Sequence, residues 1–131
     1  MRTRRLGRTG FEVGELGLGT EWLVGREPGV FVDVLRLAAE RGVSYVDVLF
    51  SYPAYRDALG AAIRGIRDRF VLTGHIGCAE TAGQYRRTRD TAECAALFDD
   101  LLRRLGTDRV EVAMVQFVDT ERDYADVMRP G

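Results

Sequence analysis

Residues 43–76 decide the fold, and they read VSYVDVLFSYPAYRDALGAAIRGIRDRFVLTGHI. The run Val43–Phe50 is apolar and rich in β-formers, which predicts a buried strand. Apolar residues then recur at helical spacing over Tyr55–Ile66, and Phe70–Ile76 is again a short apolar run. A strand, a helix and a second strand in this order form a βαβ unit, whose right-handed crossover makes the two strands parallel.

The same alternation extends in both directions along the chain. The further predicted elements are a strand over Leu16–Thr20, a helix that Pro28 opens and Gly42 ends, a helix over Thr91–Leu105 that Gly106 ends, and a strand over Val110–Val118. The last run is apolar apart from Glu111 and Gln116, which is typical of a strand buried on both faces.

The segments outside these elements are polar or rich in glycine. Residues 2–14 are expected to form a short hairpin, because Gly7 and Gly10 surround a turn between two extended stretches. We expect Glu80–Arg87 to be a polar loop, and Asp119–Gly131 to end without completing a fourth helix. Since no linker or repeat divides the sequence, we expect a single domain over residues 1–131.

About four β/α units preceded by a hairpin fit two α/β folds. One is a partial TIM (β/α)8 barrel, because a complete barrel needs roughly 250 residues and this chain has 131. The other is a small, open flavodoxin-like sheet. The pattern GxxGxG over Gly14–Gly19 lacks the strict spacing of a dinucleotide-binding loop and its ribose-binding acidic residue about 20 positions later. The pattern of elements alone leaves both folds open.

Composition excludes several classes of function. Apolar residues make up 46% of the chain, charged residues 30%, and the net charge is -1, so we expect a soluble globular protein and no binding to nucleic acid. Without a membrane-length apolar run or a secretory signal, the expected location is the cytoplasm. All 19 basic residues are arginine, which excludes Schiff-base lysine chemistry. A single histidine, and two cysteines that fit no metal motif, argue against a metal site.

Four stretches carry a family resemblance. They are RRLGRTGFEVGELGLGT, VDVLFSY, LGAAIRGIRDRFVLTGHIG and LLRRLGTDRVEV. In this order and spacing they resemble the aldo-keto reductase family, and they cover almost the whole chain. The ending DTERDYADVMRPG is similar to a branch of that family with a cysteine-rich iron-sulfur segment further along, although no such cysteine cluster occurs here. The resemblance implies the N-terminal half of the barrel and an NADPH-dependent carbonyl or alcohol oxidoreductase.

The resemblance also implies an active site at the C-terminal ends of the second, third and fourth strands, where β/α barrels place their chemistry. The family uses an Asp, a Tyr, a Lys and a His there. Asp47 and Tyr52 match the first two, whereas His75 stands at the position of the lysine and Gln116 at that of the histidine. The catalytic set is therefore degenerate.

Contacts to cofactor and substrate are implied at the same edge. Thr20 and Asp47 match positions near the nicotinamide ribose of NADP(H), and Trp22 is expected to line a substrate pocket. The family holds the rest of the cofactor mostly with loops after the last barrel strands, which lie beyond this sequence. We therefore expect the isolated chain to be inactive.

The two replacements have a physical consequence. A free tyrosine has a pKa near 10, so a neighbouring buried cation helps it to donate its proton at neutral pH. An imidazole is charged mainly below about pH 6.5, so His75 would replace a lysine only in part. Gln116 can still donate an N–H to a carbonyl oxygen, as a neutral histidine would. The predicted site is impaired but chemically workable.

Each candidate also has an ordinary structural explanation. Asp47 would be a solvated loop carboxylate, Tyr52 a packing aromatic before a proline, and His75 a satisfied core histidine. Gln116 would need a hydrogen-bond partner within the strand layer, since burying its amide unpaired costs about 1–3 kcal/mol. Trp22 would simply cap the mouth of the barrel. These alternatives stay open at the level of sequence.

Two functions follow. The first is an oxidoreductase module that acts on a small-molecule carbonyl substrate and needs the other half of the barrel, from a missing C-terminal half or from a second copy in a homodimer. Half a barrel leaves two strand edges free, and free apolar edges invite pairing. The second is a non-catalytic descendant of the family, a pseudoenzyme with a binding or structural role. Neither a membrane nor a nucleic acid is expected as a partner.

Overall fold

The computed structural model describes residues 1–81 and 84–129, and its centre is a four-stranded parallel sheet. The strands lie in the order β3-β4-β5-β8. Their bounds are Gly17–Gly19, Tyr45–Val48, Val71–Ile76 and Val112–Val115. Each neighbouring pair is parallel, with Asp47 opposite Gly19 on one side and Thr73 on the other. The predicted partial barrel is confirmed.

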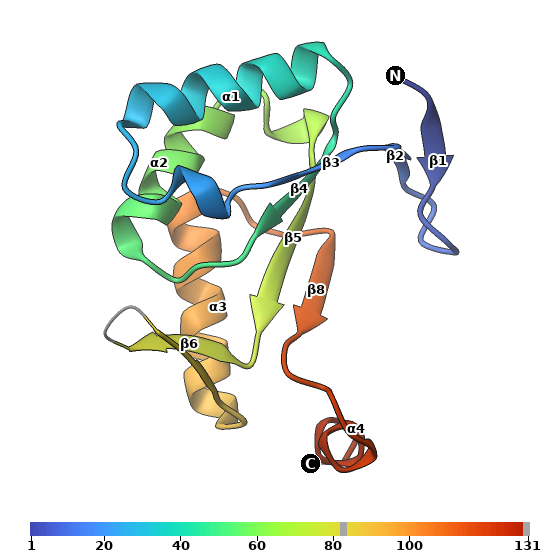
Figure 1. Cartoon of the computed structure of the whole chain (residues 1–131), viewed down its shortest axis with the longest axis vertical. Helices are drawn as coiled ribbons and strands as arrows, with labels where there is room; N and C mark the ends of the chain where they lie inside the picture. Colours follow the sequence, from blue (N-terminus) through green and yellow to red (C-terminus); the bar gives the residue numbers. More distant parts are fainter. Residues whose placement is uncertain (82–83, 130–131) are drawn as a thin grey trace.

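Three helices cover one face of this sheet (Figure 1). They are α1 (Pro28–Glu40), α2 (Pro53–Ile63) and α3 (Thr91–Leu105). Proline in the first turn starts α1 and α2, because its fixed φ suits a position that needs no N–H partner. The Asp90 side chain caps α3 by accepting from the Glu93 N–H at 2.9 Å, and Gly106 ends it at φ 65°. The bounds predicted for α3 are confirmed.

The core lies between the sheet and these helices. Successive side chains of a strand point to opposite faces, so Val46 and Val48 enter the core while Asp47 faces away from it. Phe31, Leu59 and Leu101, from α1, α2 and α3 respectively, pack against these valines. The alternation therefore places Asp47 on the inner face of the half-barrel.

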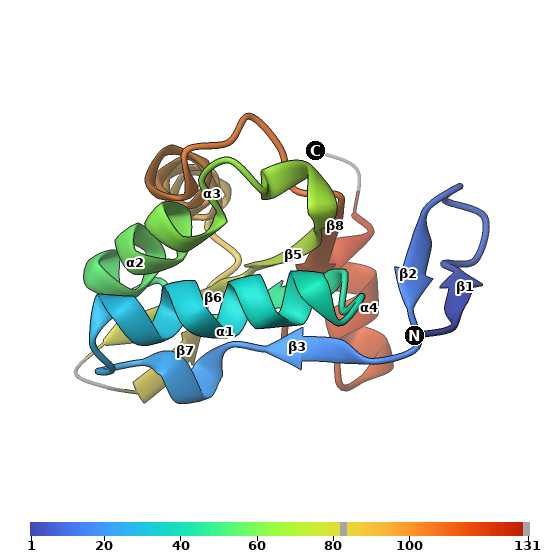
Figure 2. The ribbon, with the colours of Figure 1, turned by 90° about the horizontal axis from the view of Figure 1, so that it is seen from above.

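The N-terminal hairpin lies at the far end of the sheet from the carboxyl ends of the strands. It consists of β1 (Thr3–Arg5) and β2 (Glu12–Gly14), which pair antiparallel as predicted. The Gly14 N–H donates to Ser44 Oγ at 2.9 Å, next to the start of β4. Figure 2 shows this hairpin standing apart from the three helices.

Three expectations about the second half of the chain need correction. Glu80–Arg87, expected as a loop, belongs to an antiparallel pair, β6 (Cys78–Thr81) and β7 (Gln84–Arg87); residues 82–83 lie outside the described residues. β8 is an edge strand and largely exposed, not buried on both faces, because among the described residues it pairs with β5 alone. A short helix, α4 (Glu121–Val127), forms in the predicted tail, because Thr120 and Asp123 make a capping box at its start.

Two short 3-10 helices complete the described elements. They are η1 (Glu21–Leu23), directly after β3, and η2 (Arg67–Arg69), directly before β5.

Over residues 1–81 and 84–129, no helix combines the length and the apolar character that crossing a bilayer requires.

Candidate functional site

The carboxyl ends of four parallel strands meet at one edge of the sheet. Thr20 follows β3, Tyr52 lies in the connection after β4, His75 lies near the end of β5, and Gln116 follows β8. Trp22 lies in η1 at the same edge and is 87% exposed. The sequence-predicted residues therefore gather at one end of the molecule, and the following contacts decide which of them touch.

Asp47 and His75 form the central contact of this edge. His75 Nε2 lies 2.7 Å from Asp47 Oδ1, and the His75 side chain is only 6% exposed. An ionised carboxylate only accepts hydrogen bonds, so Nε2 carries the hydrogen in this pair. His75 Nδ1 is buried and has no protein partner among the described residues, and the same holds for Thr73 Oγ1, two positions earlier on β5. Asp47 therefore orients the His75 ring through Nε2, and Nδ1 is left without a protein partner among the described residues.

Thr20 connects the loop after β3 to the end of β4. Its hydroxyl donates to the Asp47 carbonyl oxygen at 2.6 Å and also pairs with the Tyr55 hydroxyl. Thr20 is fully buried, so its hydroxyl acts inside the protein. Burial raises the pKa of Tyr55 well above its ordinary value, and this phenol therefore stays neutral. The arrangement fixes the backbone of Asp47, while cofactor binding by Thr20 stays a prediction.

Replacing Thr20 by valine should lower the free energy of unfolding by about 1–3 kcal/mol, because the Asp47 carbonyl and the Tyr55 hydroxyl lose a buried partner. Thr20→Ser keeps the hydroxyl and should retain most of the stability. Urea unfolding monitored by circular dichroism measures both variants. Equal loss in the two would contradict a role for the hydroxyl.

Tyr52 lies at the rim in an aromatic stack. Its ring stacks on Phe50 at 5.2 Å, and Phe50 stacks on Tyr85 of β7 at 5.3 Å. Within residues 1–81 and 84–129, no hydrogen bond is formed by the Tyr52 hydroxyl. The structure thus brings Asp47 and His75 together and leaves Tyr52 in an aromatic stack.

Gln116 is held through its backbone. Its N–H donates to the Ile76 carbonyl oxygen at 2.8 Å, and its own carbonyl accepts from Arg89 Nη2 at 2.9 Å. Arg89 Nη2 also binds the carbonyl oxygen of Phe117, whose φ of 58° lies in the left-handed region. The side-chain amide of Gln116 makes no hydrogen bond to Asp47 or His75 in the described chain.

Sequence reasoning missed Glu80. Its carboxylate accepts from the Ser51 N–H at 2.8 Å and from the Ser51 hydroxyl, which ties β6 to the connection after β4. Partial burial, then the charges of Glu21 and Glu80, raises the pKa of Tyr85 to about 12. The segment around Glu80 is polar and was expected to be a loop, so Glu80 was not identified as a candidate.

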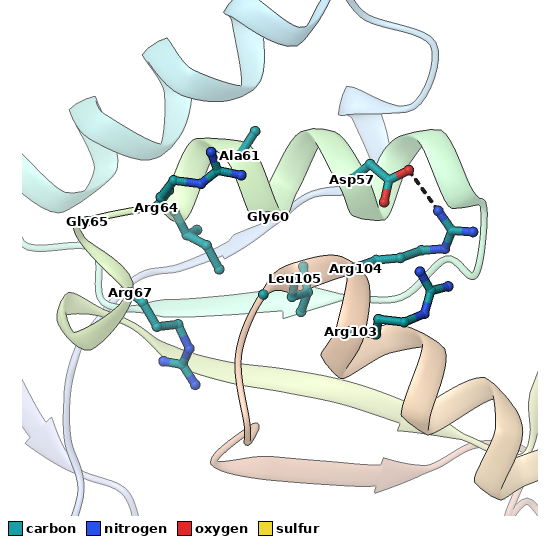
Figure 3. A pocket seen from close by; sticks show the side chains of 11 residues that line it. Asp57, Gly60, Ala61, Arg64, Gly65, Arg67, Arg103, Arg104 and Leu105 are labelled. Carbon is teal, nitrogen blue, oxygen red and sulfur yellow. Dashed lines mark hydrogen bonds and ion pairs between the residues drawn. The ribbon is translucent and has the colours of Figure 1, made fainter.

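The arginine-lined cavity in Figure 3 lies elsewhere. It has a volume of about 340 Å³ and sits between the C-terminal ends of α2 and α3, which lead to the opposite end of the sheet. Its Arg104 pairs with Asp57 and Asp100, and its Arg67 pairs with Glu111. Cations at helix C-termini also offset the helix dipole. These arginines therefore have a structural explanation, and the functional edge is the one that holds Asp47 and His75.

Fold and site together define half of a (β/α)8 barrel, and solved structures identify the family that it resembles. One from Pseudomonas aeruginosa, assigned as an aldo-keto reductase, is 30% identical, with a TM-score of 0.81 over 96% of this chain and 50% of that chain. The holo form of an aldo-keto reductase from Bacillus halodurans is 25% identical, with a TM-score of 0.78 over 94% and 43%. The resemblance to aldo-keto reductases is confirmed.

A third similar structure carries a cofactor. It is an aldo/keto reductase from Klebsiella pneumoniae in complex with NADP and acetate, 25% identical, with a TM-score of 0.60 over 81% of this chain and 36% of that chain. This chain spans about half the length, or less, of these solved structures, as expected for the N-terminal half. No protein-family model matches the sequence, and no curated protein matches it.

Proposed function

We propose that this chain is the N-terminal half of an NADP(H)-dependent carbonyl or alcohol oxidoreductase, with a degenerate catalytic set and no activity in isolation. The observation that supports this best is the Asp47–His75 pair at the carboxyl edge of the sheet. It stands at the place where the family resemblance puts an Asp–Lys pair. Tyr52 and Gln116 then take the roles of the proton donor and of the group that holds the substrate oxygen.

The proposed chemistry concerns a proton. Bound NADPH would supply a hydride to the carbonyl carbon. The Tyr52 hydroxyl would give its proton to the carbonyl oxygen. The Gln116 amide N–H would donate a hydrogen bond to the same oxygen. Asp47 orients His75, and only a protonated imidazole would supply the positive charge that helps a phenol release its proton.

The described residues fit only one end of the cofactor. Asp47 is partly exposed, and its carboxylate has one oxygen beyond the bond to His75 that can accept from a ribose hydroxyl. The Thr20 hydroxyl is already used. The holo and NADP-bound relatives support NADP(H) as the cofactor. We therefore expect micromolar binding of NADPH only in the completed barrel. A titration that follows NADPH fluorescence tests this expectation.

In a barrel completed by fusion to the unmatched half of the P. aeruginosa relative, the double variant His75→Lys, Gln116→His should raise kcat/KM for NADPH-dependent carbonyl reduction at neutral pH by about 10²-fold. The reason is that it restores a permanent cation next to Asp47 and an imidazole at the substrate oxygen. Adding Asp47→Asn should remove the gain. No activity after the repair would mean that losses extend beyond these four positions.

A non-catalytic role is the alternative, and two observations favour it. Among the described residues, the Tyr52 hydroxyl forms no hydrogen bond to Asp47 or His75, and His75 Nδ1 has no hydrogen-bond partner. A completed barrel that binds no NADPH would support this alternative, since nothing would then transfer hydride.

We further propose a small-molecule carbonyl substrate and a partner that completes the barrel, either a missing C-terminal half or a second copy. The cytoplasmic location, the single domain over residues 1–131, the substrate contact of Trp22 and the similarity to the iron-sulfur branch stay predictions. Trp22, at the carboxyl edge and exposed, is placed where an incoming substrate would meet it.

A further inference from the structure

We propose that Glu80 is a positioning residue for Tyr52. Its carboxylate, on the hairpin that β6 and β7 form, holds the backbone directly before Tyr52 and so sets where the Tyr52 hydroxyl lies at the carboxyl edge. The inference rests on the proposed function, which gives Tyr52 the part of proton donor. It adds a residue that lies outside the four predicted catalytic positions.

The polar contact is made with Ser51. Glu80 Oε2 accepts from the Ser51 N–H at 2.8 Å and from the Ser51 hydroxyl. Ser51 lies in the connection 49–52, between the end of β4 and the start of α2, where neither a strand ladder nor a helix orders the backbone. Hydrogen bonds to an ionised carboxylate are stronger than those between neutral groups. Two of them on one residue therefore fix the backbone from which Tyr52 projects.

The aromatic contact is made with Phe50. Its ring stacks on Tyr85 of β7, with centroids 5.3 Å apart and an interplanar angle of 15°. It also stacks on Tyr52, with centroids 5.2 Å apart and an angle of 22°. The hairpin therefore contacts two successive residues, Phe50 and Ser51, directly before Tyr52.

Both contacts come from one cross-strand pair. Glu80 and Tyr85 lie opposite each other in the register of β6 and β7, and the side chains of such a pair project to the same face of the ribbon. The neighbouring pair, Ala79 and Arg86, points to the other face. β6 follows almost at once on β5, the strand that carries His75 (Figure 1). The hairpin thus places the connection before Tyr52 relative to the strand of His75.

Glutamine is the matched conservative variant at this position. Glu80 Oε1 is buried and has no hydrogen-bond partner among the described residues. The NH2 group of a glutamine can take that place while its oxygen accepts both bonds from Ser51. Alanine removes both bonds. Glu80→Gln should therefore preserve the position of Tyr52, and Glu80→Ala should not.

The first measurement uses the chain itself. Amide hydrogen exchange followed by NMR should show the Ser51 N–H exchanging faster by about tenfold or more in Glu80→Ala, because this N–H loses its partner. The Tyr52 ring resonances should shift in the same variant. Glu80→Gln should leave both near the parent values. Arg86→Ala removes a surface ion pair from the other face of the hairpin and should change neither.

The second measurement is kinetic and uses the fused barrel that carries His75→Lys and Gln116→His. Glu80→Ala should lower kcat for carbonyl reduction about tenfold and change KM less than about twofold, because a displaced proton donor slows the chemical step and not substrate binding. Glu80→Gln should recover most of the kcat. If Glu80→Ala does not fold, Ser51→Ala removes one of the two bonds and should lower kcat by a smaller factor.

Unchanged exchange of the Ser51 N–H in Glu80→Ala would overturn the proposal. An unchanged kcat in Glu80→Ala or, in its place, Ser51→Ala would overturn it too, and so would a rise in KM at constant kcat. A repaired barrel without activity would contradict the proposed function. In that case Glu80 still positions Tyr52 if the ring resonances move in Glu80→Ala and not in Glu80→Gln, and unmoved resonances would overturn the inference as well.

Discussion

Gly60→Ala should lower the free energy of unfolding by about 2–3 kcal/mol. Gly60 lies in α2 where this helix crosses α3, and an added Cβ would stand 2.2 Å from the Arg104 carbonyl oxygen and 3.0 Å from Leu105 Cα. Both neighbours are backbone atoms, so one of the two helices must shift. The higher helix propensity of alanine returns at most about 1 kcal/mol, which does not offset this clash.

Gly29→Ala is the matched control for this prediction. Gly29 lies in the first turn of α1, and no atom lies within 4 Å of an added Cβ. We expect its stability to be unchanged or higher by up to about 1 kcal/mol, because alanine restricts the unfolded chain. Urea unfolding midpoints of the two variants provide the comparison. A Gly60→Ala protein as stable as the parent would show that the two helices are not in close contact.

Arg56→Met should lower the free energy of unfolding by about 3–5 kcal/mol. The Arg56 side chain is 4% exposed and donates to the carbonyl oxygens of Phe50 and Leu97 and to the Asp100 carboxylate, at 2.9–3.0 Å. Burial lowers the pKa of this arginine, and Asp100 opposes the shift. Methionine fills much of the volume but leaves the buried carbonyl groups without a donor.

Arg103 provides the control, because it binds the same carboxylate from the surface. Its side chain is 64% exposed, so Arg103→Met should cost less than about 1 kcal/mol. Denaturant unfolding separates the two effects. Similar losses from both arginines would contradict the importance of burial.

The Arg56–Asp100 pair predicts that the stability of the fold depends on pH. Desolvation raises the pKa of Asp100, but the hydrogen bonds and charges of Arg104 and Arg56 outweigh it, and the folded pKa lies below the ordinary value. Asp100 therefore stabilises the fold at a pH above its unfolded pKa, and this contribution is lost as the pH falls through the lowered folded pKa. In Arg56→Met the acid-induced loss should be smaller. Thermal unfolding between neutral and acid pH measures it.

The fold could be predicted wherever a residue pattern is local. Apolar periodicity and the flanking Gly106 placed α3 at its observed bounds. The exposure of β8 was not predictable, because an apolar run does not reveal which strands will pair with it. The β6–β7 pair was missed because its residues are mostly polar, which is equally typical of a loop.

The candidate site could be predicted in part for the same reason. Parallel strands end at one edge, so Asp47 and His75 were expected to be neighbours, and the 2.7 Å contact agrees with this. The surroundings of Tyr52 could not be predicted, because its stack with Phe50 and Tyr85 depends on the missed β6–β7 pair. The hydroxyl chain through Thr20 joins residues far apart in the sequence, and no spacing rule indicates it.

The hydrogen bonds from Arg89 to the backbone after β8 limit how the length of related sequences can vary. Arg89 lies in the short link between β7 and α3, and its guanidinium binds the carbonyl oxygens of both Gln116 and Phe117. The length of this link therefore fixes the position of the backbone that follows β8. Deleting one residue from that link would move Arg89, and either its bonds to the backbone after β8 or the register between β8 and β5 would be lost. Insertions and deletions in related chains should therefore avoid this link.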